Sequence, residues 1–102
     1  MKYSFHPEAE NELNLAIDYY EECKKGLGYE FAFEVYMAVA RARTYPQAWQ
    51  VIEGDVRRSL VNRFPYGVLY AREKKELLII AVMHLHQKPG YWKKRTLTHK
   101  PL

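Results

Sequence analysis

The sequence predicts an α+β fold in which a helical hairpin packs on a small, mainly antiparallel sheet. Apolar residues recur at helical spacing over two segments of the first half, and a short Gly-Leu-Gly sequence joins these segments. Strand-like apolar runs separated by turn signals fill the second half. The expected order is therefore β-α-α-β-β-β. With 102 residues and no linker-like stretch, we expect one domain over residues 1–102.

Residues 1–5 are expected to form a short strand, because a helical pattern begins at Pro7. Proline suits the first turn of a helix, where its missing N–H has no partner to lose. Acidic residues such as Glu8 follow it, and they are favourable near the positive end of the helix dipole. The first helix should end near Lys25, where Gly26 or Gly28 supplies a stop.

A second helix is expected from about Tyr29 to Arg43, with Pro46 just beyond its end. The loop between the two helices is short, so they should run antiparallel. Residues 46–54 are interpreted as a connector that Trp49 anchors.

Three strands are expected in the second half, over residues 56–64, 68–72 and 77–85. Tyr66-Gly67 is interpreted as a turn between the first two strands, and residues 73–76 form a charged hairpin loop before the third. The third strand is apolar on both faces, which predicts a central strand that is covered on both sides.

Charge is distributed unevenly along the chain, whose net charge is +4. Residues 1–54 carry nine acids and five bases, a balance of −4, whereas residues 55–102 carry three acids and eleven bases, a balance of +8. This asymmetry predicts an anionic partner for the second half, which could be nucleic acid, an acidic protein or a membrane surface.

Cysteine content and hydropathy predict the compartment. The single cysteine, Cys23, cannot form an internal disulfide, so the reducing cytoplasm is the expected location. The longest apolar run, residues 77–83, has the length of a strand rather than a membrane helix. No apolar stretch of signal-peptide length occurs at the N-terminus.

The ordered set of short motifs resembles the RelE/ParE superfamily of bacterial type II toxins, and looks closest to ParE-like, plasmid stabilization members. The resemblance covers nearly the whole chain. The motifs that carry it are Phe5-His6-Pro7-Glu8-Ala9, Ala16-Ile17-Asp18-Tyr19-Tyr20-Glu21, Gly26-Leu27-Gly28, Tyr45-Pro46, Arg57-Arg58, Arg63-Phe64-Pro65-Tyr66-Gly67-Val68-Leu69-Tyr70, Ile80-Ala81-Val82-Met83-His84 and Pro89-Gly90-Tyr91-Trp92-Lys93-Lys94-Arg95.

The resemblance implies a toxin that a cognate antitoxin binds and neutralises. ParE-like members inhibit DNA gyrase, whereas RelE-like members cleave messenger RNA in the ribosomal A site without metal. We therefore predict growth arrest through gyrase inhibition. The first alternative is a ribosome-dependent, metal-independent mRNA endonuclease, and the second is a non-toxic relative that only binds antitoxin. With this resemblance, a membrane becomes the least favoured anionic partner.

The nuclease alternative needs a base for the 2′-OH, cations for the phosphate and an acid for the leaving oxygen. Its candidate catalytic residues are Arg57 and Arg63 as phosphate ligands, His84 as base or acid, and Tyr91 as a group that orients the nucleobase. Strand alternation over residues 56–64 places Arg57 and Arg63 on one face. The same alternation places His84 and His86 on a shared face.

A second set of basic and aromatic residues is predicted to bind the target or the antitoxin. An ordinary solvated face is the other interpretation of the cations. Tyr91 and Trp92 either stack on a nucleobase or cap the sheet by burying aromatic surface. RelE-like nucleases typically place lysines on the first basic strand, and this sequence has none there, which disfavours a RelE-type mechanism. The predicted binding residues are Arg58, Arg72, Trp92, Lys93, Lys94 and Arg95.

No cofactor or metal is expected, because the sequence holds no P-loop, Gly-x-Gly-x-x-Gly, Cys-x-x-Cys or His-Glu-x-x-His motif. His84 and His86 lack neighbouring cysteines or acids in the sequence that would complete a metal site. The antitoxin is expected along the helical hairpin and across a sheet edge, as an amphipathic helix or an added strand. Homodimers or hetero-oligomers with antitoxin are both open, and the basic tail over residues 89–102 is either a binding arm or a frayed end.

Overall fold

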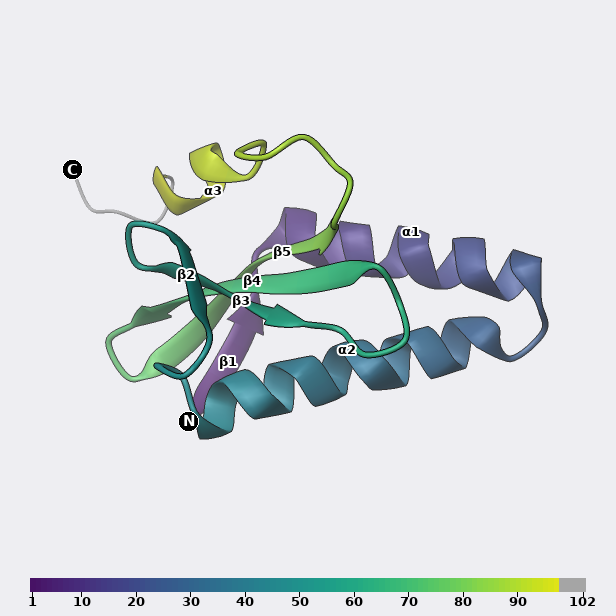
Figure 1. Cartoon of the computed structure of the whole chain (residues 1–102), viewed down its shortest axis with the longest axis horizontal. Helices are drawn as coiled ribbons and strands as arrows, with labels where there is room; N and C mark the ends of the chain where they lie inside the picture. The colour runs from purple at the N-terminus through teal and green to yellow at the C-terminus, as the bar shows by residue number, and fades with distance from the viewer. Residues whose placement is uncertain (98–102) are drawn as a thin grey trace.

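A computed structural model describes residues 1–97 of the chain and confirms the predicted α+β class (Figure 1). The strands form one five-stranded sheet in the order β1-β5-β4-β3-β2, in which only β1 and β5 pair in parallel. The elements are β1 (Lys2–Phe5), α1 (Pro7–Cys23), α2 (Leu27–Thr44), β2 (Gln50–Glu53), β3 (Val56–Leu60), β4 (Tyr66–Glu73), β5 (Glu76–His84) and α3 (Lys93–Leu97).

The helical hairpin forms as predicted, with a tighter loop. The His6 Nδ1 accepts the Glu8 N–H at 3.1 Å and caps α1. Gly26, the residue before α2, adopts the left-handed conformation at φ 88°. The Glu21 carboxylate accepts the N–H groups of Gly26 and Gly28 at 2.9 and 3.0 Å, so α2 begins at Leu27, two residues before the predicted start. A Cβ on Gly28 would lie 2.6 Å from the Ile17 carbonyl oxygen, which is why glycine stands at this helix contact.

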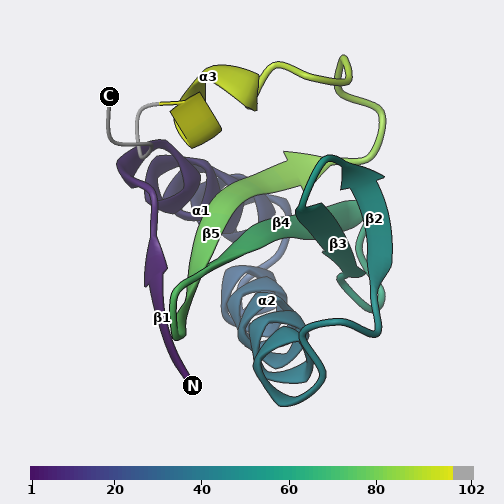
Figure 2. The same cartoon turned by 90° about the vertical axis from the view of Figure 1, so that its left-hand side faces the viewer.

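The two helices cover one face of the sheet, and the main core lies between the helices and that face. Residues of α1 and α2 share the main core on one face, whereas Trp92, just before α3, packs on the other face; Figure 2 shows α2 and α3 on opposite sides of the sheet. Aromatic rings from α1, α2 and β4 meet edge to face in this core, for example Phe31 and Tyr66 with centroids 4.9 Å apart. Burial of this apolar surface is the main stabilising contribution. The largest fully buried side chains in this core include Phe31, Val35, Val39, Val68, Tyr70, Leu77 and Ile79.

A β-bulge in β5 sets which residues face the helices. Leu69 pairs with Ala81 while Tyr70 pairs with Ile79, so Ile80 is the extra residue. The inserted residue shifts the alternation by one position. As a result, Val82 faces the main core, whereas Ala81 joins Ile80 on the opposite face. The interior of β5 is buried on both faces, as predicted for the central strand.

The opposite face holds a smaller core that the C-terminal segment covers. Trp92 is 3% exposed and packs with the residues of β4 and β5 that point away from the hairpin, such as Leu69 and Met83. The helix α3 was not predicted, because five residues are too few to show a helical period. The predicted basic tail also includes residues 98–102, which lie outside the described residues.

Three differences from the predicted strands exceed a one-residue shift of a boundary. Residues 46–54 were expected to be a connector, but Gln50–Glu53 form the edge strand β2, whose four side chains are all exposed and therefore show no alternation. The strand expected over residues 56–64 ends at Leu60, because the chain turns and Arg63 has φ 73°. Tyr66 and Gly67 lie within β4 rather than in a turn.

Candidate functional site

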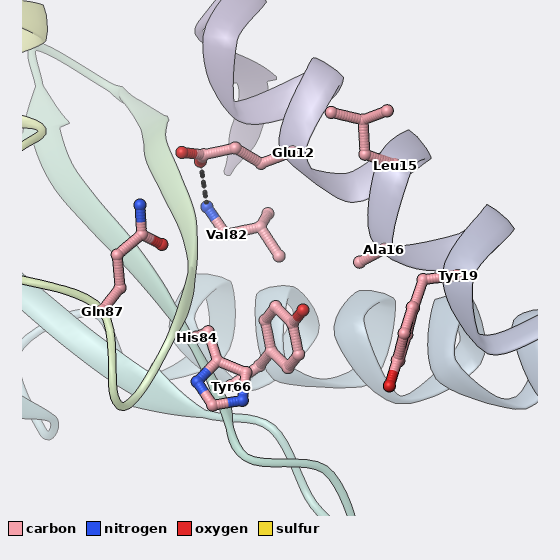
Figure 3. Close-up of a pocket in the computed structure, with 8 residues that line it drawn as sticks. All are labelled: Glu12, Leu15, Ala16, Tyr19, Tyr66, Val82, His84 and Gln87. Atoms are coloured by element: carbon pink, nitrogen blue, oxygen red, sulfur yellow. Dashed lines mark hydrogen bonds between the residues drawn. The ribbon is translucent and has the colours of Figure 1, made fainter.

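A pocket of about 250 Å³ lies between α1 and the end of β5 (Figure 3). It forms because β1 pairs with β5 only as far as Phe5↔Ile79, whereas β5 continues to His84. The edge of β5 that faces away from β4 therefore has no strand partner beyond Ile79 within residues 1–97, and we call this stretch the β5 notch. The pocket is lined by Glu12, Leu15, Ala16, Tyr19, Tyr66, Val82, His84 and Gln87.

His84 is the candidate catalytic residue that lines this pocket. Its ring lies edge-on to Tyr66, with centroids 5.1 Å apart and planes at 75° (Figure 3). The His84 Nδ1 accepts the backbone N–H of His86 at 3.1 Å, so a neutral ring carries its proton on Nε2. In this arrangement a neutral imidazole offers a hydrogen-bond donor at Nε2, and its Nδ1 lone pair is already engaged by the His86 N–H.

Glu12 closes the β5 notch from α1. Its Oε1 accepts the Val82 N–H at 3.0 Å and an Arg95 Nη1 hydrogen at 2.9 Å, while its Oε2 accepts from Arg95 Nη2 at 2.9 Å. Arg95 Nη1 also donates to the Ile80 carbonyl at 3.0 Å. The pair thus replaces a missing strand partner with side chains. Neither residue carries a local sequence signal for this contact, since they lie 83 positions apart.

Burial and charge shift the pKa values of the groups behind the pocket. Burial alone would lower the pKa of Arg95, but the Glu12 carboxylate together with Tyr91 and Glu8 outweighs it, and the pKa is raised. The Tyr91 ring lies 5.0 Å from the Arg95 Cζ, and burial, followed by the Glu12 charge, raises the pKa of the Tyr91 hydroxyl. This phenol therefore gives up its proton less readily than an ordinary tyrosine.

The other two candidate catalytic residues lie in different surroundings. Arg57 Nη1 donates to the carbonyls of Gln47 and Trp49 at 3.1 and 2.7 Å. Arg63 pairs with Glu30 of α2 at 2.7 Å, and it lies in a turn rather than on the face shared with Arg57 that strand alternation predicted. Among the contacts of residues 1–97, none joins either arginine to His84 or Tyr91. The predicted catalytic group is therefore not assembled as a unit.

The predicted binding residues divide between the surface and the interior. Arg72, Lys93 and Lys94 are exposed, and Lys93 pairs with Glu53 at 3.2 Å. Arg58 is partly buried and Arg95 is held in its ion pair with Glu12. The indole of Trp92 is buried in the smaller core, in agreement with the sheet-capping interpretation, so it reaches a partner only if the C-terminal segment leaves the sheet.

The outer face of α2 carries an exposed apolar surface. Tyr29 is 78% exposed and Phe33 is 54% exposed, and Tyr36 and Met37 continue the same stripe of α2 one turn further along. We call these four residues the α2 stripe. Helical spacing identified the stripe, but it could not distinguish a buried face from one that is left open.

None of the helices that the structure describes is both long and apolar enough to cross a membrane. Over residues 1–97, no group of three or more histidine, cysteine or acidic side chains is arranged to hold a metal ion.

The arrangement of a helical hairpin on a mixed, mostly antiparallel sheet is the RelE/ParE-type toxin fold. A solved structure of this fold, titled "Chromosomal ParDE TA system from P. aeruginosa", superposes with a TM-score of 0.74 at 16% sequence identity. The match covers 84% of this chain and 97% of that chain. No family model matches the sequence, and a search of curated proteins finds no match.

Proposed function

We propose that this chain is the toxin of a type II toxin–antitoxin pair, that it acts in the cytoplasm by inhibiting DNA gyrase, and that a cognate antitoxin neutralises it. The observation that supports this proposal most directly is the fold, which is similar along most of the chain to a structure titled as a ParDE TA system. The motifs that resemble ParE-like proteins point in the same direction. Protein–protein inhibition also needs no assembled catalytic group.

The α2 stripe supports the proposed antitoxin, as a protein that covers the hairpin. Exposed aromatic and methionine side chains along one helix face are typical of a surface that binds a partner helix or extended segment. The first half of the chain also carries most of the acidic residues, so basic residues of an antitoxin around an apolar centre would complement it. Such a complex would be a hetero-oligomer.

Inducible expression in bacteria without the antitoxin tests the target. DNA synthesis should stop first and cells should form filaments, while amino-acid incorporation continues. An immediate stop in protein synthesis with cuts in ribosome-bound transcripts would instead support the nuclease alternative. Unimpaired growth at full expression would support the non-toxic relative.

Co-purification with the product of the adjacent reading frame tests the antitoxin. We expect a small acidic protein to bind, and Phe33→Asp to weaken that binding at least tenfold, because a charge would enter the centre of the apolar contact. Leu85→Asp is the matched control, since Leu85 is an exposed apolar residue away from the hairpin. Equal loss in both variants would contradict docking on the α2 stripe.

A further inference from the structure

A second stretch of open strand edge lies near the opposite lateral edge of the sheet, where β2 begins. The pairing between β2 and β3 runs from Glu53↔Val56 to Gln50↔Arg58, so the end of β3 at Leu60 has no β2 partner. A pocket of about 410 Å³ opens there, and we call it the β3 notch. It is lined by Arg41, Trp49, Gln50, Arg58, Leu60 and Asn62.

The β3 notch holds two positive charges and no acidic side chain. Arg41 Nη2 donates to the Leu60 carbonyl at 3.1 Å, and Arg58 Nη2 donates to the Gln50 Oε1 at 3.1 Å. The Arg58 Nε is buried and makes no hydrogen bond within the part of the chain that the structure describes. Both guanidinium groups therefore interact with neutral acceptors, and their charges are not compensated by any carboxylate that lines the pocket.

The fold holds both arginines in position. A Cβ on Gly67 would lie 2.8 and 2.9 Å from the Cδ and Cγ of Arg58, so the absence of a side chain at Gly67 leaves room for the Arg58 stem. Arg41 lies in the last turn of α2, and the Trp49 Nε1 donates to the Arg41 carbonyl at 3.2 Å. Two donor groups fixed in this way lose little conformational entropy when an anion binds.

We infer that the β3 notch binds a carboxylate side chain of an extended, acidic and apolar segment of a partner protein. A carboxylate matches the planar donor fork of arginine. Leu60, which lines the notch, is half-exposed, and this favours an occupant that also carries apolar side chains. The open edges of β3 and β2 offer backbone groups to an extended chain. A nucleic-acid strand would instead need a continued track of cations, whereas the remaining lining groups are amides and apolar side chains.

A fluorescently labelled, end-capped peptide with the sequence Val-Glu-Val-Glu-Val-Glu is a suitable probe, with fluorescence anisotropy as the measurement. The purified full chain should bind it, and should bind the same peptide with glutamine in place of glutamate at least tenfold more weakly, as the loss of a charge-assisted hydrogen bond implies. Arg58→Met, which keeps the aliphatic stem over Gly67, and Arg41→Gln should each weaken binding by about tenfold. Lys75→Gln, in the exposed turn before β5, removes the same charge and should change binding less than twofold.

Gly67→Ala separates position from charge. The added methyl group would displace the Arg58 side chain while every charge is retained, so peptide binding should weaken with an unchanged net charge. It also tests the site if Arg58→Met does not fold, which far-UV circular dichroism would show. Equal binding of the two peptides, or equal effects of Arg58→Met and Lys75→Gln, would overturn the inference. So would tighter binding of a ten-nucleotide uridine RNA with the same dependence on Arg41 and Arg58. None of these results depends on whether the chain inhibits gyrase.

Discussion

The β5 notch and the β3 notch are two solutions to the same structural problem. In each, a central strand continues past the end of its neighbour and leaves backbone groups at an open edge. At the β5 notch the Glu12–Arg95 pair caps both an N–H and a carbonyl, and its two charges cancel. At the β3 notch Arg41 caps one carbonyl and the charge remains. A closed edge contributes stability, whereas an edge left charged is available for recognition.

The largest effect is expected at the closed edge. Glu12→Gln should lower the free energy of unfolding by about 3 kcal/mol, because Arg95 would keep a mostly buried charge without its carboxylate. Urea denaturation measures this, with Glu22→Gln at an exposed position of α1 as the control. The double variant Glu12→Gln/Arg95→Met should recover more than half of the loss. Equal costs for Glu12→Gln and Glu22→Gln would show that the pair does not stabilise this edge.

Alkaline pH should loosen the same edge by a smaller amount. Burial raises the pKa of Tyr91, so the folded chain keeps a proton that the unfolded chain loses near pH 10. Stability is therefore full below pH 10 and falls as the pH rises above it, by at most about 1.4 kcal/mol per pH unit for this group. Tyr91→Phe should flatten the decline between pH 10 and 11 in thermal unfolding. Parallel curves for the two proteins would contradict this assignment.

The open edge should contribute little to stability. Arg41→Gln removes a solvent-exposed hydrogen bond to the Leu60 carbonyl, and we expect a loss of about 0.5 kcal/mol in urea denaturation. A cost near that of Glu12→Gln would mean that both edges are structural, and the comparison between them would fail.

Converting the open edge into a closed one should have the smallest effect on stability. Leu60→Glu places a carboxylate beside Arg41 and Arg58, where it can pair with them as Glu12 pairs with Arg95. The free energy of unfolding should change by less than about 0.5 kcal/mol, because the new pair is partly exposed. Binding of the acidic peptide should nevertheless disappear in the anisotropy measurement. Retained binding would show that the peptide does not occupy the β3 notch.

Much of the fold was predictable because long periodic segments carry their own signal. The helices from Pro7 and Leu27 and the doubly buried strand β5 are examples. The strand β2 was not predictable from its pattern, because backbone pairing with β3 holds an exposed edge strand whose side chains show no alternation. The end of β3 was misplaced because apolar residues continue past Leu60, at Val61 and Phe64, through what is a turn.

The candidate sites were less predictable than the fold because their members come from distant segments. His84 was expected at a strand end and is found there, but no local pattern marked Glu12, which lines the same pocket. Charge counting directed attention to the second half of the chain, whereas Arg41 of the β3 notch comes from the acidic half. Packing, and not local sequence, brings these groups together.

The Glu12–Arg95 pair also has a consequence for the lifetime of the folded state. Its members are separated by 83 positions, so forming this contact closes a loop that spans most of the described chain. A contact of this kind should form after the rate-limiting step of folding, and disrupting it should speed unfolding much more than it slows folding. The pair would then govern how long a molecule stays folded rather than how quickly it first folds, which matters for a protein exposed to cellular proteases.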